Sequence, residues 1–361
     1  MTRIARLASS ALAATLALAC RDSRDSAPPA PAPPVAASAA PRPAFDPSVL
    51  GALAPLPKSA DGASPASAER VLLGRMLYAD LRLSKNHDVS CDSCHKLGAF
   101  GVDGEATSVG HKKQRGGRNA PTVLNAALHF RQFWDGRAVD VEEQATGPIQ
   151  NPIEMASSER RAVAVLASMP EYVAAFERAF PGEKAPITLK NVGVAIGAFE
   201  RKLLTPSRFD RYLAGDRSAM TEAELAGAAL FVRTGCTVCH AGPLLGGQSY
   251  QKVGAVTPWP NQKDQGVFEL TKADADRLKF KVPSLRNVEK TGPYFHDGAT
   301  AKLGDAVRLM ARHQLGRELH DSEIDSIVTF LGALTAPTPA DLATPPALPK
   351  STPKTPKPDP T

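Results

Sequence analysis

Two copies of a Cys-x-x-Cys-His motif constrain this chain more than any other feature of its sequence. They are Cys91-Asp92-Ser93-Cys94-His95 and Cys236-Thr237-Val238-Cys239-His240. In such a motif the two thiols lie one helical turn apart, where they can bond the two vinyl groups of one haem, and the following histidine can bind the iron. The motifs therefore predict two covalently attached c-type haems.

Paired cysteines also suit two other kinds of site. One is a zinc site built from two Cys-x-x-Cys pairs, and the other is a redox dithiol or a disulfide. Neither explains why a histidine directly follows each pair. We therefore expect His95 and His240 to be the proximal iron ligands, with the haems attached through Cys91, Cys94, Cys236 and Cys239.

The N-terminus has the pattern of an export signal. Arg3 and Arg6 precede an apolar run that ends at Ala19, so residues 1–19 predict a signal peptide, and the run is too short for a mature membrane span. Cys20 is the one cysteine outside the motifs. Either Cys20 is lipidated as a membrane anchor, or cleavage at the Ala-x-Ala pattern gives a soluble protein without this anchor. Ala17 stands at the position where a lipobox usually has Leu, which weakens the case for lipidation. Both outcomes predict a periplasmic protein.

Residues 20–47 and 336–361 are rich in Pro and poor in residues that could form a core, so we expect a disordered tether and a disordered tail. The formal charge is +6, but no dense Lys/Arg stripe is present, which argues against nucleic acid binding. Between the two segments, apolar residues recur at helical spacing and predict a mainly α fold. The expected helices cover residues 68–79, 158–167, 171–179, 189–204, 221–233, 303–313 and 321–334.

The chain also repeats itself. Residues 120–125 (Ala-Pro-Thr-Val-Leu-Asn) are echoed by residues 282–287 (Val-Pro-Ser-Leu-Arg-Asn), and Phe133-Trp134-Asp135-Gly136 is echoed by Phe295-His296-Asp297-Gly298. Both echoes have the same offset, and each follows one of the two motifs. The repeat predicts two tandem cytochrome c-like haem domains with long ordered loops, at residues 48–210 and 211–335.

A proximal histidine leaves the sixth iron position open, and its occupant decides the chemistry. For the second haem the candidates are Met310, His296, His313 and His320. Met310 lies on a helical stretch inside the repeat, whereas His313 and His320 are expected to face solvent. A methionine on a helix is equally suited to a core position, so spacing alone leaves this choice open.

Several ordered segments resemble the bacterial dihaem cytochrome c peroxidases. The resemblance covers residues 68–334, and the nearest competing group is the methylamine-utilisation dihaem oxygenases of the same superfamily. The segments that carry it are Ser90–His95, Ser108–His111, Arg118–Thr122, Phe133–Arg137, Asn151–Met155, Gly292–Gly298 and Gln314–Gly316.

For the first haem the resemblance implies a low-potential, peroxidatic centre. His95 would be its proximal ligand, and His111 would be a detachable sixth ligand that blocks the iron in the resting oxidised enzyme. Glu154 would be the acid/base residue of the opened pocket, since a carboxyl group can move the proton that peroxide cleavage requires. Gln144 would be a polar partner of the peroxide.

For the second haem the resemblance implies a high-potential centre held by His240 and Met310, with Trp134 between the two haems. It also implies a calcium ion at the domain interface, because amide and carbonyl oxygens suit this hard cation. The calcium ligands would be Asn119, Thr291 and Pro293.

The implied activity is reduction of hydrogen peroxide with electrons from a small exported carrier, either a cytochrome c or a copper protein, by a homodimer. Two alternatives remain. One is an electron-transfer cytochrome without peroxide turnover. The other is an oxygenase of the methylamine-utilisation type, a group that has Tyr at the position of Met310, and here Tyr294 lies nearby in the sequence.

Overall fold

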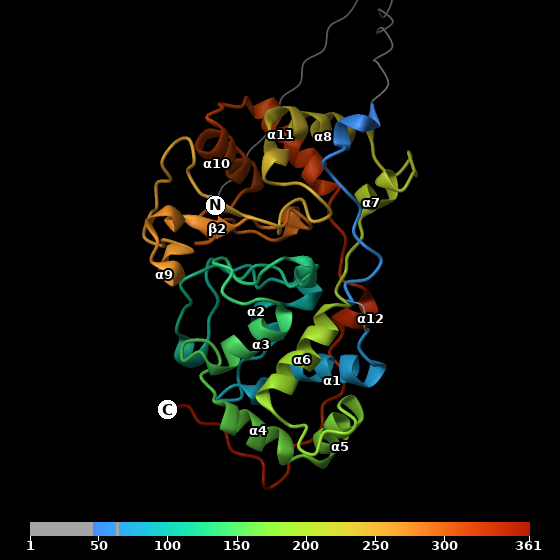
Figure 1. Cartoon of the computed structure of the whole chain (residues 1–361), viewed down its shortest axis with the longest axis vertical. Coiled ribbons are helices and arrows are strands. Elements are labelled where there is room, and N and C mark those ends of the chain that lie inside the picture. Colours follow the sequence, from blue (N-terminus) through green and yellow to red (C-terminus); the bar gives the residue numbers. More distant parts are fainter. Residues whose placement is uncertain (1–45, 63–64) are drawn as a thin grey trace, which may run out of the picture. The chain divides into compact units, whose positions relative to one another are not determined.

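The computed structural model describes residues 46–62 and 65–361, which belong to one compact unit. The predicted signal peptide, Cys20 and nearly all of the predicted tether lie outside these residues. The described part is mainly helical, which confirms the predicted fold class (Figure 1). Its α-helices are α1 Ala68–Ala79, α2 Cys91–Cys94, α3 Val141–Gln150, α4 Glu159–Ala167, α5 Pro170–Ala179, α6 Leu189–Glu200, α7 Arg208–Leu213, α8 Glu222–Thr234, α9 Phe268–Thr271, α10 Leu303–Leu315, α11 Asp321–Gly332 and α12 Ala340–Ala343.

One hydrophobic core forms where α1, α3, α5 and α6 pack together. α1 begins at the N-cap Ser67, whose side chain accepts a hydrogen bond from the Arg70 amide, as expected for a helix start. The helix crosses α6 closely, because a Cβ atom at Gly74 would lie 1.8 Å from the Ala195 carbonyl oxygen. This core holds the segment that carries the first motif.

A second hydrophobic core lies under α8 and α11, with α10 packed on α11. α8 begins with a capping box, in which Thr221 accepts from the Glu224 amide and Glu224 accepts from the Thr221 amide. α8 ends at Gly235, whose left-handed φ of 99° turns the chain into the second motif. A short antiparallel pair, β1 Tyr250–Lys252 and β2 Lys279–Lys281, lies in the same half, with Gln251 opposite Phe280.

The sequence repeat has a structural counterpart in the backbone. Asn125 and Asn287 both adopt φ = 61°, and a bridge between Gln132 and Ala138 is matched by one between Tyr294 and Thr300. The side-chain amides of Asn125 and Asn287 both donate to the Thr205 hydroxyl, at 2.9 and 3.0 Å. A single threonine between the halves therefore ties together the equivalent turns of the two repeats.

The C-terminal segment differs from its sequence-based expectation. Residues 336–361 were expected to form a disordered tail, but the structure describes them as a strap that runs along the first half of the chain (Figure 1). The Thr338 hydroxyl donates to the Leu97 carbonyl at 2.7 Å, and Arg82 donates to the Pro349 carbonyl at 2.8 Å. Further along, Thr355 is buried and its hydroxyl bonds Ser168 at 2.8 Å. The composition of the C-terminal segment cannot predict these contacts, because their partners are residues in the first half of the chain.

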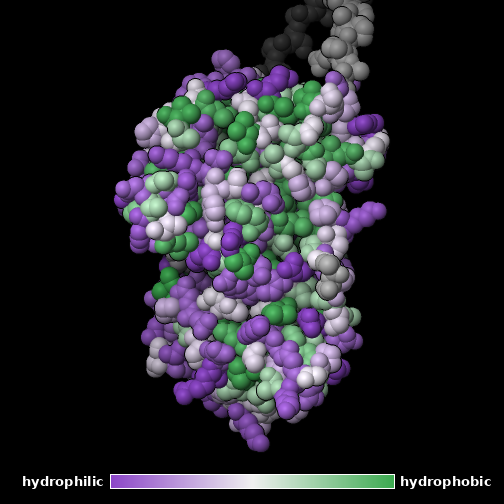
Figure 2. Space-filling view, in the orientation of Figure 1, coloured by the Kyte–Doolittle hydropathy of each residue, from purple (hydrophilic) through white to green (hydrophobic). Residues whose placement is uncertain are grey.

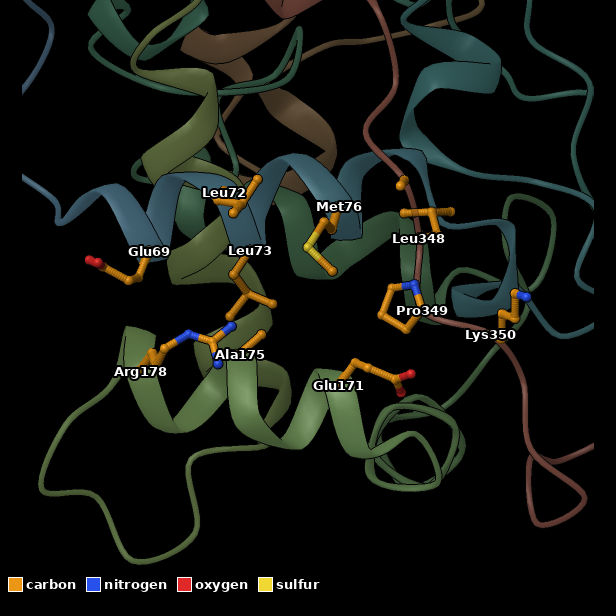
Figure 3. Close-up of a pocket in the computed structure, with 11 residues that line it drawn as sticks. Glu69, Leu72, Leu73, Met76, Glu171, Ala175, Arg178, Leu348, Pro349 and Lys350 are labelled. Carbon is orange, nitrogen blue, oxygen red and sulfur yellow. The ribbon is translucent and has the colours of Figure 1, made fainter.

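Where the strap passes α1 and α5 it leaves a pocket (Figure 3). Leu72, Leu73 and Met76 of α1 form an apolar wall, and Glu171 and Arg178 of α5 form the opposite side. The strap closes the pocket with Leu348, Pro349 and Lys350.

On the face drawn in Figure 2, hydrophobic and hydrophilic residues are interspersed. The large exposed apolar side chains come from separate parts of the chain, for example Leu72, Val139 and Leu270, and such single residues are normal on a protein surface. Within residues 46–62 and 65–361, no helix combines the length and hydrophobicity that a bilayer crossing needs.

Candidate functional site

The first motif is a short helical turn. α2 spans Cys91–Cys94, and its N-cap Ser90 forms a capping box with Ser93. The amide of His95 donates to the Cys91 carbonyl at 2.9 Å, so the histidine follows the turn without a break. Both cysteines are free thiols, which rules out a disulfide between them in this structure.

The histidine of the first motif is half-buried. The Tyr78 hydroxyl donates to the His95 carbonyl at 2.6 Å and fixes the backbone behind the ring. Nδ1 of His95 is buried, with the backbone of Pro121 and Gly101 as its nearby polar groups. Burial lowers the pKa of His95, which favours the neutral imidazole that a metal ligand must be.

His111 lies in a tight loop beside the Glu154 segment. Its side chain is 4% exposed, and both ring nitrogens are buried without a partner among the described residues. The His111 amide donates to the Glu154 carbonyl at 2.7 Å. Gly110 permits this approach, because a Cβ atom there would lie 2.1 Å from the Ile153 carbonyl oxygen. The next residue, Lys112, has φ = 55°, a strained value for a lysine.

The side chain of Glu154 is half-buried. Burial raises the pKa of Glu154, although the positive charge of Arg137 and a 2.7 Å hydrogen bond from Asn151 partly offset this effect. The negative charge of Glu154 in turn contributes to a raised pKa of Cys94, whose main cause is burial. The structure thus brings Glu154 together with the His111 loop and the first motif.

Gln144 is less closely connected to this group. It lies half-buried on α3, and its amide donates to the Asp140 carbonyl at 3.1 Å as part of the helix start. No described hydrogen bond joins its side chain to Glu154 or His111, so its predicted role stays a prediction.

The second motif follows α8 as a 3₁₀ turn, Cys236–Val238. The His240 amide donates to the Cys236 carbonyl at 2.9 Å, as in the first motif. Here, however, Nδ1 of His240 is hydrogen-bonded to the Leu245 carbonyl at 2.9 Å, which orients the ring. Cys236 and Cys239 are free thiols.

A mostly apolar cavity opens beside the second motif. Cys236, Cys239 and His240 line it on one side, and Met310 of α10 lines it as well. Free thiols, a neutral buried imidazole and an apolar cavity are the surroundings that a covalently bound haem requires, so these residues fit the predicted group.

The four candidates for the sixth ligand of the second haem differ in whether they line this cavity. Met310 and His296 line the cavity of the second motif, and His313 and His320 are absent from its lining. His313 was expected to face solvent, but it is 8% exposed, bonds the Thr257 carbonyl at 3.1 Å and contacts Trp259 edge-on. His320 is exposed, as expected, at the start of α11.

Trp134 belongs to the first repeat but lines the cavity of the second motif. Its indole N–H donates to the Asn119 carbonyl at 2.9 Å, and its ring meets His296 edge-on with centroids 6.4 Å apart. His296 is in turn stacked on Phe280 at 4.2 Å. This position is compatible with the predicted place of Trp134 between the haems.

The three predicted calcium ligands make protein contacts of their own. The Asn119 side-chain amide donates to the Glu105 carbonyl at 3.0 Å, and the Asn119 backbone amide donates to the His296 carbonyl at 2.8 Å. The Thr291 hydroxyl reaches the Val288 carbonyl at 3.5 Å, and Pro293 follows a cis peptide bond. No described contact joins the three residues, so the calcium site stays a prediction.

Two supports of the motif histidines were missed by sequence reasoning. Tyr78 acts through its hydroxyl from α1, and Leu245 acts through its backbone carbonyl. A backbone acceptor leaves no signature in side-chain identity. The Leu245 turn also depends on Arg286, whose Nε donates to the Pro243 carbonyl at 2.8 Å, and Arg286 could have been noted because it lies in the repeated segment.

Comparison with known proteins agrees with this geometry. Residues 68–218 match the family described as di-haem cytochrome c peroxidase. The chain is 48% identical to cytochrome c551 peroxidase of Nitrosomonas europaea, covering 76% of this chain and 83% of that protein, and 44% identical to cytochrome c551 peroxidase of Pseudomonas aeruginosa, covering 81% and 86%. A solved MauG-like protein associated with microbial copper homeostasis matches with a TM-score of 0.68 and 28% identity, over 89% of this chain and 99% of that one.

Proposed function

The chain belongs to the di-haem cytochrome c peroxidase family, and from this premise we propose that it reduces hydrogen peroxide to water with electrons from a small carrier protein. The observation that carries the proposal is the group formed by His111, Glu154 and the first motif. A buried histidine, whose two ring nitrogens have no partner among the described residues, lies in a loop that is bonded to the backbone of a half-buried acid.

The family implies two c-type haems, and each motif has the thiols and the histidine to hold one. When bound, the haem supplies an iron that can bind peroxide and pass electrons to it. His95 and His111 would hold the iron of the first haem, and His111 would leave it when its loop moves. The left-handed backbone at Lys112 is strained for a lysine, and a movement of the loop would relieve that strain.

Glu154 would handle the proton. Its carboxylate would accept a proton from peroxide and return it to the departing oxygen, and Asn151 holds the carboxyl in place through the 2.7 Å hydrogen bond. Only the ionised form can accept, so activity should fall as the pH drops through the pKa of Glu154. Because burial raises that pKa, the fall should begin at a higher pH than for a free glutamate. Gln144 would orient the peroxide from α3.

The second half would receive the electrons. His240 and Met310 line one apolar cavity, and a methionine ligand there would favour the reduced state. Val238, between the two cysteines of the motif, is 80% exposed, so this motif lies at the surface where a carrier protein can approach. Trp134 would link this centre to the first haem. We assign the peroxidatic domain to residues 48–210 and the electron-transfer domain to residues 211–335.

Several finer features of the function also belong to this proposal. The names of the relatives indicate a small cytochrome c as donor, and a copper protein is the other carrier of suitable size. We place the enzyme in the periplasm, with Cys20 as a lipid anchor, as a homodimer. A calcium ion held by Asn119, Thr291 and Pro293 would stabilise the interface between the haem domains.

Two other functions are less well supported. A pure electron-transfer cytochrome would not need a buried histidine, without a partner among the described residues, next to a half-buried acid whose pKa is raised. An oxygenase of the methylamine-utilisation type would use a tyrosine at the second haem. Tyr294 lines that cavity, but its hydroxyl is already bonded to the Val288 carbonyl at 3.1 Å, whereas Met310 is free of such a bond among the described contacts.

The variant Glu154→Gln tests the proposal. It keeps the size of the side chain and removes the proton acceptor, so kcat for peroxide should fall by about 10²–10⁴-fold while both haems remain bound. Glu177→Gln, on the exposed face of α5, is the matched control and should keep full activity. If Glu154→Gln turned over peroxide as fast as the control, the carboxyl would have no role in proton transfer.

A further inference from the structure

Lys281 is a buried cation in the second half of the chain that the proposed reaction does not use. It ends β2, and its whole residue is 5% exposed. Its backbone amide donates to the Trp134 carbonyl at 2.8 Å, and its ammonium lies 2.5 Å from Nδ1 of His129. Both partners belong to the segment of the first repeat that faces the second half.

No acidic side chain of the described residues balances this charge. Lys281 takes part in none of the ion pairs within residues 46–62 and 65–361, although neighbouring Lys279 is paired with Asp276 at 3.0 Å. A buried ammonium without a counter-charge is costly, because burial removes its hydration. Burial correspondingly lowers the pKa of Lys281 to about 7. Burial, followed by the charge of Lys281, lowers the pKa of His129, so the imidazole is a neutral hydrogen-bond acceptor.

Lys281 also lines the cavity of the second motif. It is the one Lys or Arg among the described lining residues, and none of them is Asp or Glu. The other polar side chains of the lining include Gln251 and Gln314, which are neutral. A haem brings two propionate carboxylates into a cavity of this kind, and a carboxylate is the counter-charge that a buried ammonium lacks.

We propose that Lys281 binds a propionate of the second haem, and that His129 holds its ammonium at that place from the first half of the chain. The inference rests on the proposed second haem. It assigns a role to the contact between the halves: the segment from His129 to Trp134 fixes the charge environment of the electron-accepting centre. A positive charge beside the haem favours the state that has gained an electron, so Lys281 helps to keep the potential of this centre high.

The variant Lys281→Met tests this in the intact protein loaded with both haems. Removing the cation should shift the midpoint potential of the second haem to more negative values, measured by spectroelectrochemical titration in which the two haems are resolved. The potential of the first haem should move less. With isotopically labelled propionates, the carboxylate bands in the reduced-minus-oxidised infrared spectrum should also shift in the variant.

Lys252→Met is the matched control, because it removes the same charge from the exposed partner strand β1. Lys281→Gln is a second variant that keeps a hydrogen-bond donor for His129, and its second-haem potential should fall as well. The inference is overturned if Lys281→Met or Lys281→Gln binds both haems and matches the control in potential and infrared spectrum, or if only the first haem responds. A wild-type protein with fewer than two haems would instead contradict the proposed function.

Discussion

The buried ion pair between Arg286 and Asp210 supports the second haem site, and its loss should be costly. The side chain of Arg286 is 0% exposed and that of Asp210 is 8% exposed, with the nitrogen and oxygen 2.5 Å apart. Asp210 also accepts from the amides of Leu56 and Ser207, both at 2.7 Å. Arg286 in turn holds the Pro243 carbonyl at the start of the turn whose next residues orient His240.

Asp210→Asn removes the negative charge and leaves the guanidinium buried without a counter-charge. The expected loss in unfolding free energy is about 3–5 kcal/mol, the range for breaking one side of a buried pair. Glu318→Gln breaks the exposed pair with Arg312, which water screens, so its unfolding free energy should stay close to that of the wild type. Guanidinium denaturation of both variants, with the haems attached, measures the difference.

A double variant separates the effect of the buried charge on stability from the effect of packing. Adding Arg286→Met to Asp210→Asn removes the stranded cation and should recover part of the lost stability, because an apolar side chain of similar length can replace the buried arginine. If Asp210→Asn were no less stable than Glu318→Gln, the buried pair would not hold this part of the fold together.

The other predictions concern the two haem sites. Met310→His should lower the midpoint potential of the second haem, because imidazole stabilises the oxidised iron more than sulfur does, and an unchanged potential would exclude Met310 as its ligand. Gly110→Ala should disturb the His111 loop, because the new methyl group would lie 2.1 Å from the Ile153 carbonyl oxygen. Its resting absorption spectrum should change at the first haem only, and an unaltered spectrum would contradict the close packing of the loop on the Glu154 segment.

Local patterns in the sequence predicted much of the fold. α1 covers the predicted residues 68–79, and α4, α5, α8, α10 and α11 begin within one residue of their predicted starts. Among the described α-helices longer than four residues, two were missed, α3 and α7. α3 contains Gly147 and Pro148 in its last turn, which interrupt the helical signal, and α7 is only six residues long. Neither has an apolar repeat long enough to detect.

Candidate site residues could be predicted where they are neighbours in the sequence and form a motif. The two motifs predicted the thiols and histidines directly, and the resemblance implied roles for His111 and Glu154, whose backbones the structure brings together. Contacts between segments that lie far apart in the sequence could not be predicted. The burial of His313 under Trp259, the Lys281–His129 pair and the ordered C-terminal strap all depend on partners that lie far away in the sequence.

The central claim is that this protein couples two unlike haem centres to reduce peroxide. The most direct measurement mixes the half-reduced protein with hydrogen peroxide and a reduced small cytochrome c, and follows oxidation of the cytochrome. Because each peroxide needs two electrons to become water, we expect two donor molecules oxidised per peroxide consumed, in repeated turnovers. A protein that carried both haems yet never oxidised the donor in response to peroxide would contradict this claim.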